Sequence, residues 1–84
     1  MPTISYFYGI IIVMFLLDKE HNPPHIHALY GDTSAAFKIE NGELMKGEFP
    51  KRGKKLVKEF INHYKVELLE MWESGVYYKL PPLK

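Results

Sequence analysis

The stretch SAAFKIENGELMKGEF, residues 34–49, decides the fold, because it holds two strand patterns joined by a turn. Apolar and polar side chains alternate from Ser34 to Glu40, so the apolar ones share one face of a strand. Asn41-Gly42 is typical of a type I′ turn, and residues 43–49 return as the next strand before Pro50. The stretch therefore predicts an antiparallel hairpin.

Two further strands are predicted before this hairpin. Residues 10–17, IIIVMFLL, are apolar throughout, which is typical of a strand covered on both faces. The double proline at positions 23 and 24 lacks two amide donors, so it excludes a helix and a central strand there. Residues 25–30 then form the next strand. In chain order the four strands make an antiparallel meander.

A helical period replaces the strand pattern from about residue 51 to about residue 73. Its apolar side chains recur one, three or four positions apart; they are Leu56, Val57, Phe60, Ile61, Tyr64, Leu68 and Trp72. Gly75 is a suitable helix end, and residues 76–84 form an extended tail. We predict one α+β domain over residues 1–84, a four-stranded antiparallel β-meander with one long C-terminal helix packed on one face.

Composition excludes several classes of protein. The chain has no cysteine, so it forms no disulfide, thiolate zinc site or cysteine nucleophile, which agrees with a reducing cytoplasm. Its longest apolar run is too short for a membrane helix, which takes about 20 residues. We expect a soluble cytoplasmic protein without a membrane partner. Because a chain of 84 residues buries little surface alone, a homodimer is an open alternative.

Three of the four histidines lie in the segment HNPPHIH, residues 21–27. Because strand side chains alternate, His25 and His27 share one face. This pair suits acid–base catalysis by a metal-independent ribonuclease, or its hydrogen bonds simply fix the proline bend. A histidine metal site needs further ligands, for which the candidates are His21, Asp18, Glu20 and His63. All three interpretations stay open, and we assign no metal ligand and no cofactor.

The start of the predicted helix is strongly basic. Six of the eleven lysine and arginine residues gather there, namely Lys46, Lys51, Arg52, Lys54, Lys55 and Lys58. Because a helix begins with free amides at the positive end of its dipole, this arrangement favours an anion, either a phosphate backbone or an acidic protein surface. The alternative is a solvated helix whose packing tolerates the charges. No aromatic residue lies among the five cations from Lys51 to Lys58, so base stacking is not predicted.

Short motifs along the chain resemble one known family. They are MPTIS at 1–5, FYGI at 7–10, HNPPHIH at 21–27, YG at 30–31, GEFP at 47–50, MWE at 71–73 and PLK at 82–84. Together they resemble small bacterial proteins of the domain of unknown function 4160 family. The resemblance implies no established activity, but it implies a second small protein encoded nearby, as in toxin–antitoxin pairs. It also implies a site on His21, Asn22, His25 and His27, with Lys51-Arg52 as its basic edge.

We therefore expect an interaction module of a toxin–antitoxin-like two-protein system, which binds a small protein partner or nucleic acid. Its candidate binding residues are His21, Asn22, Lys51, Arg52, Lys54 and Lys55. The first alternative is the ribonuclease, with His25 and His27 as catalytic residues and the basic helix start on the phosphate. The second alternative is the histidine metal site. Leu29 stands where the family often has a charged residue, which makes a polar site beside the histidines less favoured.

Overall fold

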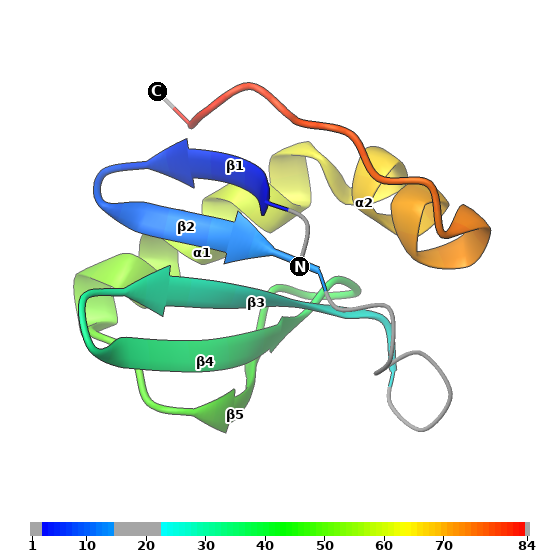
Figure 1. Cartoon of the computed structure of the whole chain (residues 1–84). Helices are drawn as coiled ribbons and strands as arrows, with labels where there is room; N and C mark the ends of the chain where they lie inside the picture. The colour runs from blue at the N-terminus through cyan, green and yellow to red at the C-terminus, as the bar shows by residue number, and fades with distance from the viewer. Residues whose placement is uncertain (1–2, 15–22, 84) are drawn as a thin grey trace.

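The computed structural model describes residues 3–14 and 23–83, which form a five-stranded antiparallel sheet with two helices on one face (Figure 1). Each strand is hydrogen-bonded to the next one in the chain. The strands are β1 Thr3–Phe7, β2 Ile10–Val13, β3 His25–Tyr30, β4 Thr33–Lys38 and β5 Leu44–Gly47. The prediction of an α+β fold with an antiparallel meander is confirmed.

The predicted number of four strands is wrong, because β1 was not recognised. Ile4 and Ser5 are both buried, and the pairing of β1 with β2 shifts between Thr3 and Ser5. Such a bulge breaks the alternation by which a strand is recognised in a sequence. At the other end of the hairpin, β2 ends at Val13. Residues 15–17 of the predicted strand lie outside the described residues.

The predicted type I′ turn at Asn41-Gly42 is also wrong. Gly42 has a positive φ of 74°, but Asn41 does not, whereas a type I′ turn needs both. The Gly42 amide donates to the Lys38 carbonyl at 2.8 Å, and the Glu43 amide donates to Asn41 Oδ1 at 2.9 Å. The asparagine side chain therefore closes a wider loop, and β5 is shorter than the predicted strand 43–49.

The prediction of one long helix over residues 51–73 is wrong as well. The structure has α1 at Lys51–His63 and α2 at Lys65–Ser74, with a break at Tyr64, where φ is −112° and ψ is 27°. A straight helix over residues 51–74 would be about 36 Å long, but the longest dimension of the molecule is 30 Å. The break lets α2 stay against the end of the sheet. Neither helix of the described residues is long and apolar enough to cross a membrane.

The core lies between the sheet and both helices. Phe7 of β1 stacks on Phe60 of α1, with their ring centroids 4.9 Å apart, and Phe60 is fully buried. The described end of the chain, residues 76–83, is extended and runs beside β1 (Figure 1). There the Leu80 amide donates to the Ile4 carbonyl at 2.8 Å. This segment therefore covers part of the outer edge of β1.

Candidate binding site

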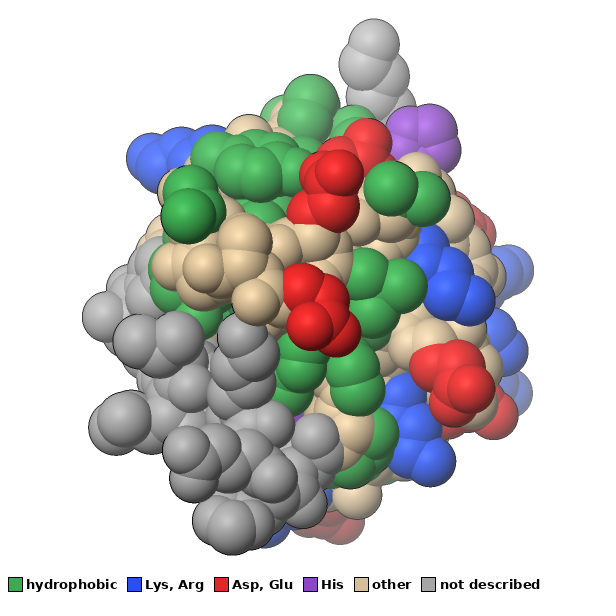
Figure 2. Space-filling model, turned by 90° about the vertical axis from the view of Figure 1, so that its right-hand side faces the viewer, with side chains coloured by type: hydrophobic (Ala, Val, Ile, Leu, Met, Phe, Trp, Pro, Cys, Tyr) green, Lys and Arg blue, Asp and Glu red, His purple; other side chains and the backbone are tan. Residues whose placement is uncertain are grey.

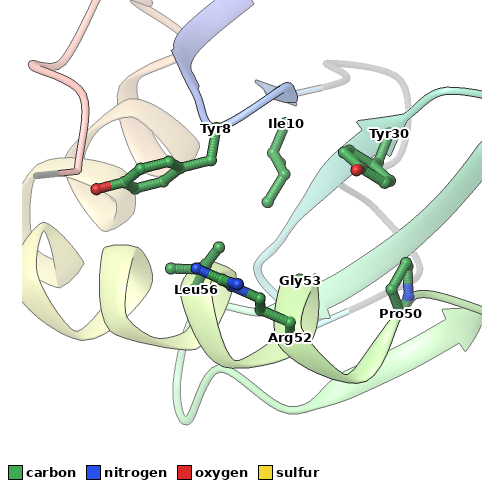
Figure 3. A pocket seen from close by; sticks show the side chains of 7 residues that line it. All are labelled: Tyr8, Ile10, Tyr30, Pro50, Arg52, Gly53 and Leu56. Carbon is green, nitrogen blue, oxygen red and sulfur yellow. The ribbon is translucent and has the colours of Figure 1, made fainter.

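One end of the sheet carries a pocket of about 430 Å³ (Figure 3). Because β1, β3 and β5 all run toward this end, the β1–β2 turn, the β3–β4 turn and the start of α1 meet there. The lining residues are Tyr8, Ile10 and Tyr30 from the sheet side and Pro50, Arg52, Gly53 and Leu56 from the helix side. We call this site the tyrosine pocket.

Tyr8 occupies an unusual backbone conformation at the rim of the tyrosine pocket. Tyr8 and Gly9 form a two-residue turn between the paired Phe7 and Ile10, and their φ values are +50° and +79°. Positive φ at both positions is the type I′ pattern, for which asparagine or glycine is preferred at the first position. A tyrosine there costs about 1–3 kcal/mol of strain. Its side chain remains 58% exposed, so burial of the ring does not offset this cost.

Tyr30 forms the opposite wall. It is the last residue of β3, and a Cβ atom on Gly9 would lie 3.1 Å from Tyr30 Cε1, so the ring packs over the bare backbone of the β1–β2 turn. The ring is also 6.3 Å from that of the buried Phe49. Figure 3 shows Tyr8 and Tyr30 on opposite sides of Ile10. The two hairpin turns therefore place one aromatic ring on each side of the tyrosine pocket.

The first turn of α1 supplies the cationic side of the tyrosine pocket. Arg52 and Leu56 are one helical turn apart and both line it. Gly53 leaves room for the ring of Phe49, which lies just before the helix, because a Cβ atom there would lie 2.6 Å from Phe49 Cε2. No side chain caps the helix at Pro50, and no acidic residue lies in its first turn. Positive charge and the helix dipole therefore add rather than cancel.

The predicted binding residues on the helix do lie together. Five exposed cations of α1 form what we call the basic band, which consists of Lys51, Arg52, Lys54, Lys55 and Lys58. Arg52 belongs to both the basic band and the tyrosine pocket. Sequence reasoning found the cations but missed Tyr8 and Tyr30. The available signal was the pair of Tyr-Gly steps at 8–9 and 30–31, because a glycine after each tyrosine marks a turn.

The histidine pair lies at the other end of β3. The rings of His25 and His27 are 5.1 Å apart, as their shared face predicts, and His25 is only 3% exposed. His25 Nδ1 donates to the Pro23 carbonyl at 2.9 Å, and its ring lies 5.1 Å from Trp72 of α2. These contacts match the structural interpretation, in which an imidazole fixes the proline bend.

The structure does not bring the histidine pair and the tyrosine pocket together. His25 and Tyr30 are the two ends of β3, so they are about 16 Å apart at 3.3 Å per residue. His63 lines another hollow, beside Pro81 and Pro82. Among residues 3–14 and 23–83, no three histidine or acidic side chains form a group that could hold a metal ion. The predicted residues His21 and Asn22 lie outside the described residues.

Helix α2 is more acidic than α1, because it carries Glu67, Glu70 and Glu73 against one lysine. Figure 2 shows acidic side chains among apolar ones on the side of the molecule where α2 lies, with basic side chains toward the right edge of the view. Tyr78 of the extended segment donates its hydroxyl hydrogen to Glu70 Oε1 at 3.4 Å. Desolvation raises the pKa of Tyr78 above its usual value of 10.0, and the charges of Glu70 and Glu67 and the hydrogen bond add to the effect. The acidic side chains of α2 and the basic band of α1 therefore lie on different helices.

Replacing Glu70 with glutamine is expected to lower the pKa of Tyr78. A raised pKa in the folded state contributes stability that is present below the unfolded value near 10.0 and is lost as pH rises through the folded value. The Glu70→Gln variant should therefore lose less stability than the wild type above about pH 10. NMR titration of the Tyr78 Cζ carbon measures the pKa directly. Glu73→Gln is the matched control, and equal pKa shifts in both variants would refute the assignment to Glu70.

Comparison with known proteins agrees with the sequence motifs. The model of the family described as Domain of unknown function (DUF4160) matches residues 9–73. The chain belongs to this family. No curated protein and no solved structure gives a significant match. The DUF4160 region contains Tyr30, the basic band and the histidine pair, whereas Tyr8 lies one residue before it. The family description names no activity.

Proposed function

We propose that this DUF4160 protein binds single-stranded nucleic acid at the tyrosine pocket and the adjoining basic band. The observation that carries the proposal is the position of Arg52, which lies in both. A ligand at Arg52 is therefore within reach of aromatic rings on one side and lysines on the other. The volume of about 430 Å³ is in the usual range for small-ligand pockets, roughly 300–1,000 Å³.

The chemistry of both parts fits a nucleotide chain. Proteins that bind single strands combine a positive surface along the phosphates with aromatic side chains on which the bases stack. Arginine can bind phosphate through two parallel hydrogen bonds, and its planar group also stacks on rings. In the sequence the basic band lacks aromatic residues, but the fold brings Tyr8 and Tyr30 beside it from two other turns. Aromatic rings for base stacking are therefore present beside the cations, although they come from other parts of the sequence.

A small acidic protein, as in a toxin–antitoxin-like pair, is the alternative ligand for the basic band. Such a partner needs the lysines and Arg52 but makes no specific use of two exposed tyrosines at the end of the sheet. Base stacking gives these rings a role, and it also accounts for the strained backbone at Tyr8. The geometry therefore favours nucleic acid, and the protein partner is the outcome that the tyrosine variants would reveal.

Replacing Arg52 with glutamate is expected to weaken binding and to stabilise the fold. Binding of a fluorescein-labelled single-stranded oligonucleotide of about 12 nucleotides, measured by anisotropy, should become about tenfold weaker, because a charge-assisted hydrogen bond is lost. A negative charge in the first turn of α1 interacts favourably with the helix dipole and stabilises the helix by about 0.3–1 kcal/mol. The melting temperature should therefore rise. Binding and stability should change in opposite directions.

The matched control is Lys79→Glu, which makes the same change of charge in the exposed tail segment, outside the tyrosine pocket and the basic band. It should leave oligonucleotide binding nearly unchanged. An equal loss in both variants would show that only the net charge matters. No binding by the wild type at low salt would refute the proposed function.

A further inference from the structure

A second groove lies on the other side of α1, with a volume of about 460 Å³. We call it the lysine groove. Its helix wall consists of Lys51, Lys54, Lys55 and Lys58. Its opposite wall consists of Phe37, Gly42, Glu43 and Leu44 from the end of β4, the following loop and the start of β5. Four lysine side chains therefore line a cleft that also contains the apolar Phe37 and Leu44 and one carboxylate.

The lysine groove and the tyrosine pocket are joined over the crest of α1. Lys51 and Lys55 also line a shallow hollow that contains Arg52, Leu56 and one carboxylate, Glu59. Arg52 and Leu56 also line the tyrosine pocket. Cations thus continue from the tyrosine pocket, over the first two turns of the helix, into the lysine groove. An extended anion bound at Arg52 can follow this path along Lys51 and Lys55, which outnumber the single carboxylate of Glu59 in the linking hollow.

The wall of the lysine groove opposite α1 is held closely against the helix. A Cβ atom on Gly42 would lie 2.7 Å from Lys58 Cγ and 3.2 Å from Lys58 Cα, so the loop packs directly on the helix. The same loop is closed by the bond from the Glu43 amide to Asn41 Oδ1. The groove is therefore largely formed before any ligand arrives, which reduces the entropy lost on binding.

Glu43 is the negative group in the lysine groove. Its Oε2 atom lies 3.5 Å from Lys58 Nζ, and the two side chains are 60% and 50% exposed. Ion pairs this exposed are weak and easily exchanged. A phosphate is also an anion, so it competes with the Glu43 carboxylate for Lys58. The Glu43 carboxylate therefore occupies the place beside Lys58 Nζ that a backbone phosphate would take.

We propose that the lysine groove is a second subsite for the same strand, which binds backbone phosphates while a base occupies the tyrosine pocket, and that Glu43 weakens binding by competing for Lys58. This inference rests on the proposed function and adds the path of the strand across α1. Lysine is a flexible point charge without the planar fork of arginine, so the lysine groove contacts phosphates without reading sequence.

The test measures binding of the labelled oligonucleotide, by anisotropy at several salt concentrations, to the wild type and to four variants. Glu43→Gln should bind about 1.5- to 5-fold more tightly, the fold-change that corresponds to an exposed ion pair. Lys54→Gln should reduce the slope of log K against log salt by about 0.7, as expected when one phosphate contact to a single strand is lost. Tyr30→Leu should weaken binding without changing that slope.

The matched control for Glu43→Gln is Glu40→Gln, which removes an exposed charge from the same loop but outside the lysine groove. Equal changes in affinity for these two variants, or an unchanged salt slope in Lys54→Gln, would overturn the second subsite. If Tyr30→Leu still weakens binding in that case, the proposed function stands without it. Absence of binding by the wild type would overturn both.

Discussion

Replacing Gly47 with alanine is expected to lower the free energy of unfolding by about 2–5 kcal/mol, the sum of the cost of the left-handed conformation and of overpacking. Gly47 has φ +87°, a conformation that alanine rarely adopts. A Cβ atom there would also lie 2.6 Å from the Ser34 carbonyl oxygen and 3.1 Å from Ala35 Cα. Both atoms belong to the backbone of β4, which pairs with β5 at this position. The strand cannot move away without breaking that pairing.

Urea denaturation followed by circular dichroism measures this loss. The control is Gly31→Ala, because Gly31 also has a positive φ, of 57°, but no atom lies within 4 Å of the Cβ position. That variant should lose only the cost of the left-handed conformation, about 1–2 kcal/mol. Equal losses in the two variants would show that crowding against β4 contributes nothing.

Gly47 also illustrates how much of the fold can be read from the sequence. Alternation predicted β4, and the Pro-Pro step marked the start of β3, because these signals depend on each residue's own chemistry. β1 was missed, since its bulge places Ile4 and Ser5 on the same side. The position of Gly47 against β4 depends on a partner strand, so no local pattern indicates it.

The break between α1 and α2 was invisible for a similar reason. The apolar spacing from Leu56 to Trp72 continues through Tyr64 without a glycine or proline. A straight helix over residues 51–74 would be about 36 Å long, more than the 30 Å longest dimension of the molecule, and the break keeps α2 within that length. Local signals therefore predict where elements occur, whereas the dimensions of the assembled molecule decide how long they can remain straight.

The candidate site was half predictable. The cations of α1 are close in sequence, so their grouping followed from their spacing. Tyr30 and the start of α1 lie at the same end because an antiparallel meander reverses direction at every turn. The strands predicted at residues 25–30, 34–40 and 43–49 are therefore enough to place Tyr30 near the start of the helix. The clustered histidines favour a site at the opposite end of β3, where the structure instead buries His25 against Trp72.

Replacing Tyr8 with asparagine is expected to stabilise the fold and to weaken binding of the single-stranded oligonucleotide by about 5- to 150-fold. Loss of one base–aromatic stack costs about 1–3 kcal/mol, and every 1.4 kcal/mol is tenfold in affinity. Asn-Gly is the preferred type I′ pair, so the φ of +50° at position 8 would no longer be strained by a bulky side chain. Thermal melting should therefore show a higher transition temperature.

Tyr8→Phe is the control, because it keeps both the ring and the strained backbone. It should bind the oligonucleotide nearly as well as the wild type and melt at nearly the same temperature. Wild-type affinity in Tyr8→Asn would mean that no base stacks on Tyr8. If substitutions of the lysines weaken binding and substitutions of the tyrosines do not, the result would point to an acidic protein partner. A stabilised variant that no longer binds would instead show that the strain at Tyr8 persists because the exposed ring is needed for binding.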